Sequence, residues 1–163
     1  SIFRTDVMTN LENILKLTKK LRWRLTTAES CTGGLISSSL TELPGSSEIF
    51  DRGFVTYSNN AKIALLGVSL KSLEKYGAVS EQVAAEMAVG AIKKSTANIA
   101  ISVTGIAGPG GSANKKEGTV CFGMALKTGK IHTETVQFGA IGRSNVRVKT
   151  VHYALNLILN TLK

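Results

Sequence analysis

The chain has two cysteines and two histidines, residue types that can serve as a nucleophile and its base. Cys31 stands in a short loop before a helical stretch, where the N-terminus of a helix can stabilise a thiolate. His132 and His152 are the imidazoles available to take its proton. Both also have structural interpretations, because His132 falls on the outward side of a predicted strand and His152 lies in a largely apolar helix. A thiol–imidazole pair therefore stays open as an alternative.

Four short motifs resemble known active-site sequences but lack a specific context. Serine followed three residues later by lysine, a pattern of some hydrolases, occurs both at 72–75 and at 112–115, so it discriminates little. Residues 108–113 fit a dinucleotide-binding fingerprint by letter, but they include a proline and precede no predicted helix. Residues 123–130 nearly match the motif of a phosphate-binding loop but fit a hairpin turn better.

Apolar strands alternate with amphipathic helices along the chain. A late strand pair is joined by the turn signal Thr128-Gly129. The predicted helices span 8–21, 35–43, 61–66 and 144–162, with another beginning after Ser80, and the predicted strands span 23–28, 53–58, 99–104, 119–126 and 131–138. We therefore predict one domain over 1–163 with an α/β fold, a three-layer α/β/α sandwich. Its central sheet should be mixed, because the late hairpin must be antiparallel.

Two glycine-rich loops, at 29–34 and 105–111, follow predicted strands. Glycines let backbone N–H groups approach an anion closely, and open α/β sheets bind ligands at the carboxyl ends of their strands. The loops therefore predict a phosphate cradle, although glycine loops also serve as plain turns. The candidate substrate-binding residues in them are Ser30, Thr32, Gly33, Gly105, Gly108 and Gly110.

The chain is strongly basic. Of its 163 residues, 20 are Lys or Arg and 11 are Asp or Glu, which gives a net charge of +9. The basic residues are dispersed and lack the interleaved aromatic residues of a nucleic-acid-binding surface. We therefore expect an anionic small molecule as partner, and no nucleic acid.

The number of cysteines and the length of the apolar runs bear on the cellular compartment of the protein. Two cysteines cannot form a disulfide framework, and no Cys or His spacing suggests zinc, so we expect no metal and no cofactor. No apolar run reaches the length of a signal peptide or a membrane span. The sequence thus predicts a cytoplasmic protein without membrane attachment.

Five ordered motifs together resemble one known family. They are AESCTGG (28–34), PGSS (44–47), GFVTYSNNAK (53–62), GAVSE (77–81) and SVTGIAGPGG (102–111). From about Thr26 through Arg143 the chain resembles the nicotinamide-nucleotide amidase family, the C-terminal domain of the competence-damage-inducible protein CinA. The resemblance implies hydrolysis of nicotinamide mononucleotide to nicotinate mononucleotide and ammonia, in pyridine-nucleotide recycling. It also implies a homodimer or a higher homo-oligomer.

The resemblance further implies roles for particular residues. Ser47, the second serine of PGSS, would be the nucleophile, and Lys62 would be its base. Tyr57 would relay a proton or orient the pair. Thr104 and Arg143 fall at positions that the family uses for binding or support.

These roles set physical requirements. A serine that attacks an amide must lose its proton, and lysine is the natural base because the motifs contain no histidine. Lys62 must then have a lowered pKa, which we expect burial to supply together with the N-terminus of a helix capped by Asn59. A capping serine is not a free nucleophile, so Ser46 would cap the next turn while Ser47 faces the cleft.

Two positions depart from the family pattern. Residues 115–118 read KKEG where the family usually has KPVG, and Gly142 replaces an acidic residue before Arg143. These departures leave open a second interpretation, in which the chain binds the nucleotide as a sensor or protein partner without turnover.

Overall fold

The computed structural model describes residues 4–112 and 114–163, which are built around a five-stranded sheet. The strands are β1 (Leu25–Glu29), β2 (Phe50–Val55), β3 (Ile99–Gly105), β4 (Thr119–Leu126) and β5 (Ile131–Gln137). Their order in the sheet is β2-β1-β3-β4-β5. β1, β2 and β3 run parallel, whereas β4 is antiparallel to both β3 and β5. The predicted mixed sheet is therefore confirmed.

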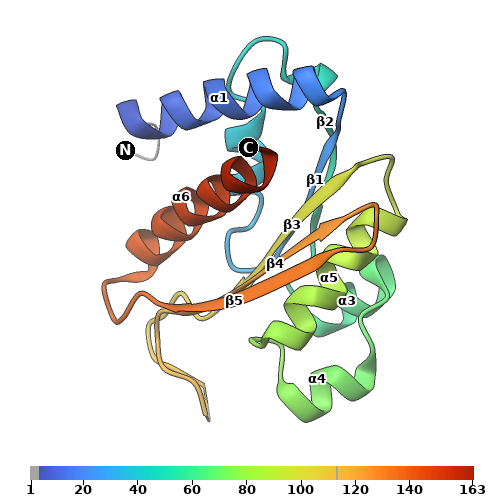
Figure 1. The fold of residues 1–163 in the computed structure, drawn as a ribbon. Helices are drawn as coiled ribbons and strands as arrows, with labels where there is room; N and C mark the ends of the chain where they lie inside the picture. The colour runs from blue at the N-terminus through green and yellow to red at the C-terminus, as the bar shows by residue number, and fades with distance from the viewer. Residues whose placement is uncertain (1–3, 113) are drawn as a thin grey trace.

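Helices cover both faces of the sheet (Figure 1). One face carries α1 (Thr5–Leu21), α2 (Leu35–Leu40) and α6 (Arg143–Leu162), and the other carries α3 (Asn59–Leu66), α4 (Leu70–Tyr76) and α5 (Glu81–Lys93). This arrangement confirms the predicted three-layer α/β/α sandwich.

The central strands are apolar because helices bury them on both sides. Every residue of β1 is buried, and β3 and β4 are buried except at their last residue. One apolar cluster lies under α1 and α6 and includes Phe122 and Leu155, and a second lies under α5 and includes Met87. The removal of these side chains from water is the main force that holds the three layers together.

Serine hydroxyls begin the helices that lead into the site. The Oγ of Ser80 accepts a hydrogen bond from the N–H of Val83 at 3.2 Å, which confirms the predicted cap of α5. For α3 the prediction was one residue too late, since the Oγ of Ser58 accepts from the N–H of Ala61 at 3.0 Å. Asn59 is already helical, whereas Ser58 has the extended backbone that a cap requires.

Candidate active site

A serine and a buried lysine meet where β1 and β2 end. Ser30 directly follows β1, and Lys62 reaches back from α3, which follows β2. The Nζ of Lys62 lies 3.0 Å from the Oγ of Ser30, 3.0 Å from the carbonyl oxygen of Thr56 and 3.4 Å from that of Tyr57. Neighbouring parallel strands bring their carboxyl ends to one edge of the sheet, so the topology joins residues that are distant in sequence.

The amine of Lys62 is removed from both water and carboxylates. The residue is 1% exposed, and it takes part in none of the ion pairs found among the described residues. Burial lowers the pKa of Lys62 from its ordinary value of 10.5, because the charged form loses its hydration, and the Coulombic effect of Cys31 only opposes this change. A lysine with a lowered pKa loses its proton more readily, which is what a general base requires.

Glu29 holds the loop after β1 from within the protein. Its carboxylate is fully buried, and Oε1 accepts from the hydroxyl of Thr32 at 2.6 Å and from the N–H groups of Gly34 and Ile36 at 3.2 and 2.9 Å. Oε2 accepts from the N–H and the hydroxyl of Ser37 at 2.9 and 2.7 Å. These bonds replace the lost hydration of the carboxylate and satisfy N–H groups at the start of α2. Glu29 thereby joins the loop to the first turn of α2.

Tyr57 and Arg143 meet at one side of the site. The Nη2 of Arg143 donates to the phenolic oxygen of Tyr57 at 2.7 Å, and its Nη1 donates to the carbonyl oxygen of Gly108 at 2.8 Å. Within the described chain, no hydrogen bond joins the phenol to Ser30 or Lys62. The contact of Tyr57 with Lys62 is made by its backbone carbonyl.

The second glycine loop is braced by side chains. The hydroxyl of Thr104 donates to the carbonyl oxygen of Ala78 at 2.8 Å, so its proton is engaged in holding the neighbouring segment. The N–H of Gly110, expected to face a phosphate, donates instead to the carboxylate of Glu117. Glu117, one of the departures from the family pattern, thus places a carboxylate against this loop.

A cavity of about 330 Å³ opens onto the serine–lysine pair. This volume falls in the range typical of small-molecule sites. Thr32 and Gly33 lie outside its lining, although they belong to the first glycine loop. The predicted site residues that line it are Ser30, Tyr57, Lys62, Thr104, Gly105, Gly108, Gly110 and Arg143.

Ser47 lies at the other end of the sheet. It belongs to a short 3₁₀ helix (Ser46–Glu48) that precedes β2, whereas Lys62 follows β2. The six residues of β2 separate the two segments, and a strand of that length spans about 20 Å. Ser47 is exposed and lies outside the cavity lining, and no side chain caps its helix, contrary to the prediction. The predicted pairing is corrected accordingly, because the serine beside Lys62 in this chain is Ser30.

Cys31 lines the cavity but is poorly suited to attack. Burial raises the pKa of its thiol to about 12, so the reactive thiolate is disfavoured. His132 lies on β5 with its side chain 59% exposed, and His152 lies within α6. Neither lines the cavity, so the geometry does not support a thiol–imidazole pair.

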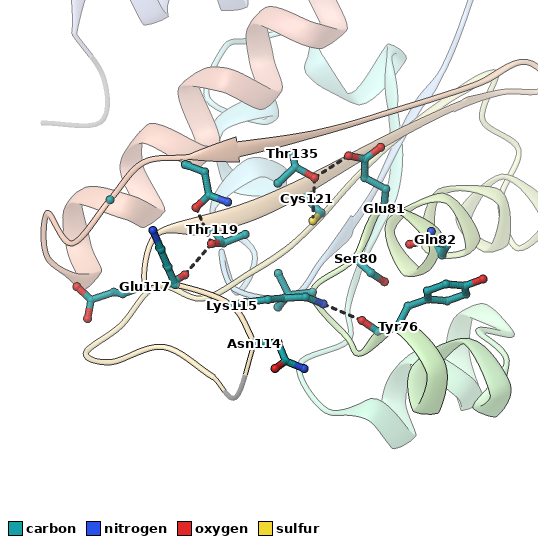
Figure 2. A pocket seen from close by; sticks show the side chains of 14 residues that line it. Tyr76, Ser80, Glu81, Gln82, Asn114, Lys115, Glu117, Thr119, Cys121 and Thr135 are labelled. Atoms are coloured by element: carbon teal, nitrogen blue, oxygen red, sulfur yellow. Dashed lines mark hydrogen bonds between the residues drawn. The ribbon is translucent and has the colours of Figure 1, made fainter.

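A larger hollow of about 900 Å³ adjoins the cavity, between the start of α5, the last two strands and the loop before them (Figure 2). Its polar groups are largely paired with one another. Lys115 donates to the carbonyl oxygen of Tyr76 at 2.7 Å, and Glu81 accepts from the hydroxyl of Thr135 at 2.7 Å. Val79 lines both spaces, but the serine–lysine pair faces the smaller one. The smaller cavity is therefore the candidate active site.

Among residues 4–112 and 114–163, no three His, Cys, Asp or Glu side chains gather in a way that could hold a metal ion. No helix in those ranges has the length and apolar character needed to cross a membrane.

Sequence reasoning left two charged residues of this site without a role. Glu29 stands at the end of an apolar strand, and a carboxylate at such a position is a signal, because buried acids need partners. Arg147 offered no comparable signal, since it is one of many basic residues in the chain.

Comparison with known proteins gives a consistent result. Residues 8–162 match the family described as the CinA C-terminal domain. The chain is 55% identical over 138 residues to the nicotinamide-nucleotide amidohydrolase PncC of Enterobacter agglomerans, covering 84% of each protein. It is 45% identical to a CinA-like protein of Chlorobaculum tepidum, and this match covers 99% of the chain but 39% of the length of that relative. The crystal structure of the competence/damage inducible protein CihA from Agrobacterium tumefaciens superposes with a TM-score of 0.94 at 46% identity, covering 99% of this chain and 98% of that one.

Proposed function

The chain belongs to the CinA C-terminal domain family, and from this premise we propose that it hydrolyses the carboxamide of nicotinamide mononucleotide to give nicotinate mononucleotide and ammonia. The observation that carries the proposal is the buried amine of Lys62, 3.0 Å from the hydroxyl of Ser30 in a cavity. The name of the Enterobacter agglomerans relative supports the choice of substrate.

Ser30 is the nucleophile in this proposal and Lys62 is its general base. A neutral amine has two N–H bonds and one lone pair. The carbonyl oxygens of Thr56 and Tyr57 can each accept a hydrogen bond from one of the two N–H groups. The lone pair is then left to accept the hydroxyl proton of Ser30. The contacts of Lys62 therefore suit the deprotonated form that a base must have.

The first chemical step forms a bond between the Oγ of Ser30 and the carboxamide carbon, while the hydroxyl proton passes to Lys62. Negative charge then develops on the former carbonyl oxygen and needs hydrogen-bond donors. The N–H of Cys31 follows the nucleophile directly, Cys31 lines the cavity, and this N–H makes no backbone hydrogen bond to another described residue. We assign it to this oxyanion, as in other hydrolases where the N–H after the nucleophile has that role.

The second step breaks the carbon–nitrogen bond. Lys62 returns the proton to the amide nitrogen, ammonia leaves, and the acyl group remains on Ser30. Water then attacks the ester and gives its proton to Lys62, which passes it to the Oγ of Ser30 as the acid is released. Each cycle consumes one water molecule and restores the neutral amine.

Arg143 is the cation that we assign to the substrate phosphate. It lines the cavity, and its guanidinium can bind a phosphate through two parallel hydrogen bonds. Binding would exchange its present contacts with Tyr57 and Gly108 for contacts with the ligand. Tyr57 thus orients Arg143 before the ligand binds, while the backbone of Gly105 and Gly108 shapes the wall behind the nucleotide.

The test compares Ser30→Ala with Ser47→Ala, a matched loss of one hydroxyl at opposite ends of the sheet: Ser30 follows β1, and Ser47 precedes β2. We expect Ser30→Ala to lower kcat for ammonia release from nicotinamide mononucleotide by about 1,000-fold or more. Ser47→Ala should stay within about threefold of the wild type, because its hydroxyl lies outside the cavity. The reverse ranking would return the nucleophile role to Ser47. Tight nucleotide binding without ammonia release by the wild type would favour a binding module.

We also propose that the protein is a cytoplasmic homodimer or larger homo-oligomer. The family resemblance supports assembly, and exposed apolar side chains at Val55, Leu65 and Leu70 are available for it. Both cysteines are free thiols, in keeping with a reducing compartment. Light scattering should give a mass of at least twice the 17.3 kDa of one chain.

A further inference from the structure

Arg147, in the first turns of α6, forms hydrogen bonds with the loop that follows the proposed nucleophile. Its Nε donates to the carbonyl oxygen of Cys31 at 3.1 Å, and its Nη2 donates to that of Thr32 at 3.3 Å. The guanidinium lies directly against this loop, because a Cβ at Gly33 would be 3.4 Å from Nη2. The guanidinium is therefore fitted against two consecutive peptide groups.

Peptide geometry carries this contact to the other side of the loop. The C=O of Thr32 and the N–H of Gly33 belong to one planar trans peptide, so the donor that fixes this carbonyl also fixes the N–H of Gly33. That N–H donates to the carbonyl oxygen of Ser30 at 3.1 Å. The C=O of Ser30 shares its peptide with the N–H of Cys31, so the direction of the Cys31 N–H is set in turn.

Glu29 and Arg147 hold the loop between them. Glu29 binds the hydroxyl of Thr32 and the N–H of Gly34 from the buried side, and Arg147 binds the two carbonyls. A guanidinium stays charged at every relevant pH and presents its donors as a rigid fork, so it can serve both carbonyls at once. A lysine at this position would offer a single point donor.

We propose that Arg147 is a positioning residue that aims the N–H of Cys31 at the oxyanion formed when Ser30 attacks. This inference rests on the proposed function, since it requires Ser30 to be the nucleophile. Arg147 itself does not line the cavity. It acts through the peptide between Thr32 and Gly33 and the hydrogen bond from Gly33 to Ser30, and its positive charge adds to the potential that stabilises the oxyanion.

The test uses Arg147→Ala and Arg147→Lys, with Lys149→Ala as a control that removes an exposed cation from the same helix. In Arg147→Ala, kcat for ammonia release should fall by about 10- to 100-fold with KM changed less than about threefold, because a misaligned donor affects the transition state. Guanidinium ion at low concentration should restore part of kcat in Arg147→Ala and none in Ser30→Ala. Arg147→Lys should be intermediate, and Lys149→Ala should match the wild type.

A second reaction separates this inference from the proposed function. Phenylmethanesulfonyl fluoride sulfonylates an activated serine, with Ser30 Oγ bonding to sulfur, fluoride leaving and the hydroxyl proton passing to Lys62. If the wild type is sulfonylated at Ser30 but releases no ammonia from the mononucleotide, the proposed substrate is wrong, and slower sulfonylation of Arg147→Ala would still support the role of Arg147.

Several outcomes overturn the role of Arg147. Unchanged kcat and unchanged sulfonylation in a folded Arg147→Ala would do so, and a wild type that undergoes neither reaction would overturn both proposals. Should Arg147→Ala fail to fold, Arg147→Lys decides, and a kcat equal to that of the wild type would remove the role.

Discussion

Lys62 is a buried primary amine that forms no ion pair with a carboxylate of any described residue. Burial favours the neutral form, and the three oxygens around Nζ are neutral acceptors or hydroxyls. An apolar side chain of similar length would fill the same space without the cost of desolvating an amine. The residue therefore has a chemical explanation where a structural one is weak.

Replacement of Lys62 by arginine should abolish turnover although the positive charge is kept. A guanidinium remains protonated and has no lone pair for the proton of Ser30, so Lys62→Arg should be nearly as inactive as Lys62→Met. We expect both to lower kcat for ammonia release by about 1,000-fold or more. Lys71→Arg, on the exposed surface of α4, serves as the control. Substantial activity in Lys62→Arg would exclude the lysine-base mechanism.

The same residue predicts a dependence of stability on pH. Between its lowered pKa and the ordinary value of 10.5, the unfolded chain binds one proton more at this site than the folded chain does. The free energy of unfolding should therefore rise with pH across this window, by up to about 1.4 kcal/mol per pH unit. This gain is lost as the pH falls toward the lowered pKa of the folded protein.

Lys62→Met lacks this proton, so urea unfolding at several pH values from neutral to about 10 isolates the contribution. The stability of the wild type relative to Lys62→Met should increase steadily with pH. Other titrating groups cancel in the difference, and the exposed Lys149→Met should show no such trend. A difference that is independent of pH would mean that Lys62 keeps an ordinary pKa in the folded protein.

Helix α5 approaches α3 more closely than any side chain would permit. A Cβ at Gly90 would overlap the carbonyl oxygen of Leu66, the last residue of α3. Because α3 carries Lys62, this packing also positions the base beside Ser30. Glycine at this point of α5 is therefore a requirement of helix packing.

Gly90→Ala sets two effects against each other. Alanine is about 1 kcal/mol better than glycine within a helix, but the overlap with a backbone atom forces the helices apart. We expect the overlap to dominate, with a net loss of about 1 to 3 kcal/mol in the free energy of unfolding. Chemical denaturation measures this, and an increase in stability would show that the two helices separate easily.

Most elements could be predicted from their patterns, and the failures have identifiable causes. α4 was not predicted because its seven residues make barely two turns, too few for a periodic apolar pattern. The cap of α3 was assigned to Asn59 although Ser58 was equally suitable, and residue types alone do not choose between adjacent candidates. Helix and strand boundaries depend on such local details.

At the scale of the whole molecule, the strand order decides which residues meet. The positions of the glycine loops after strands predicted a ligand site at one edge of the sheet, and the family resemblance pointed to Lys62. The Ser30–Lys62 contact could not be predicted, since it depends on β1 and β2 being parallel neighbours. Ser47 is close to Lys62 in the chain but separated from it in space by the length of β2. The pairing of Ser47 with Lys62 was implied by the family resemblance, and motif letters do not show that a strand separates the two residues.

The net charge of +9 gives the molecule a positive field that should assist capture of an anionic nucleotide. Salt screens such fields, with a Debye length of about 10 Å at 0.1 M. We therefore expect kcat/KM for nicotinamide mononucleotide to fall by about three- to tenfold between low salt and about 0.5 M potassium chloride. The value of kcat at saturating substrate should change little, because the buried serine–lysine pair is shielded from ions.

Nicotinamide riboside provides the matched substrate, since it has the same carboxamide and lacks the phosphate. It carries a net positive charge, so its kcat/KM should not fall with added salt and should rise slightly as repulsion is screened. Arg143→Met should reduce the salt dependence for the mononucleotide, because Arg143 is the proposed phosphate contact in the cavity. An equal salt dependence for both substrates would show that salt acts on the protein, and that its basic surface does not select the anionic nucleotide.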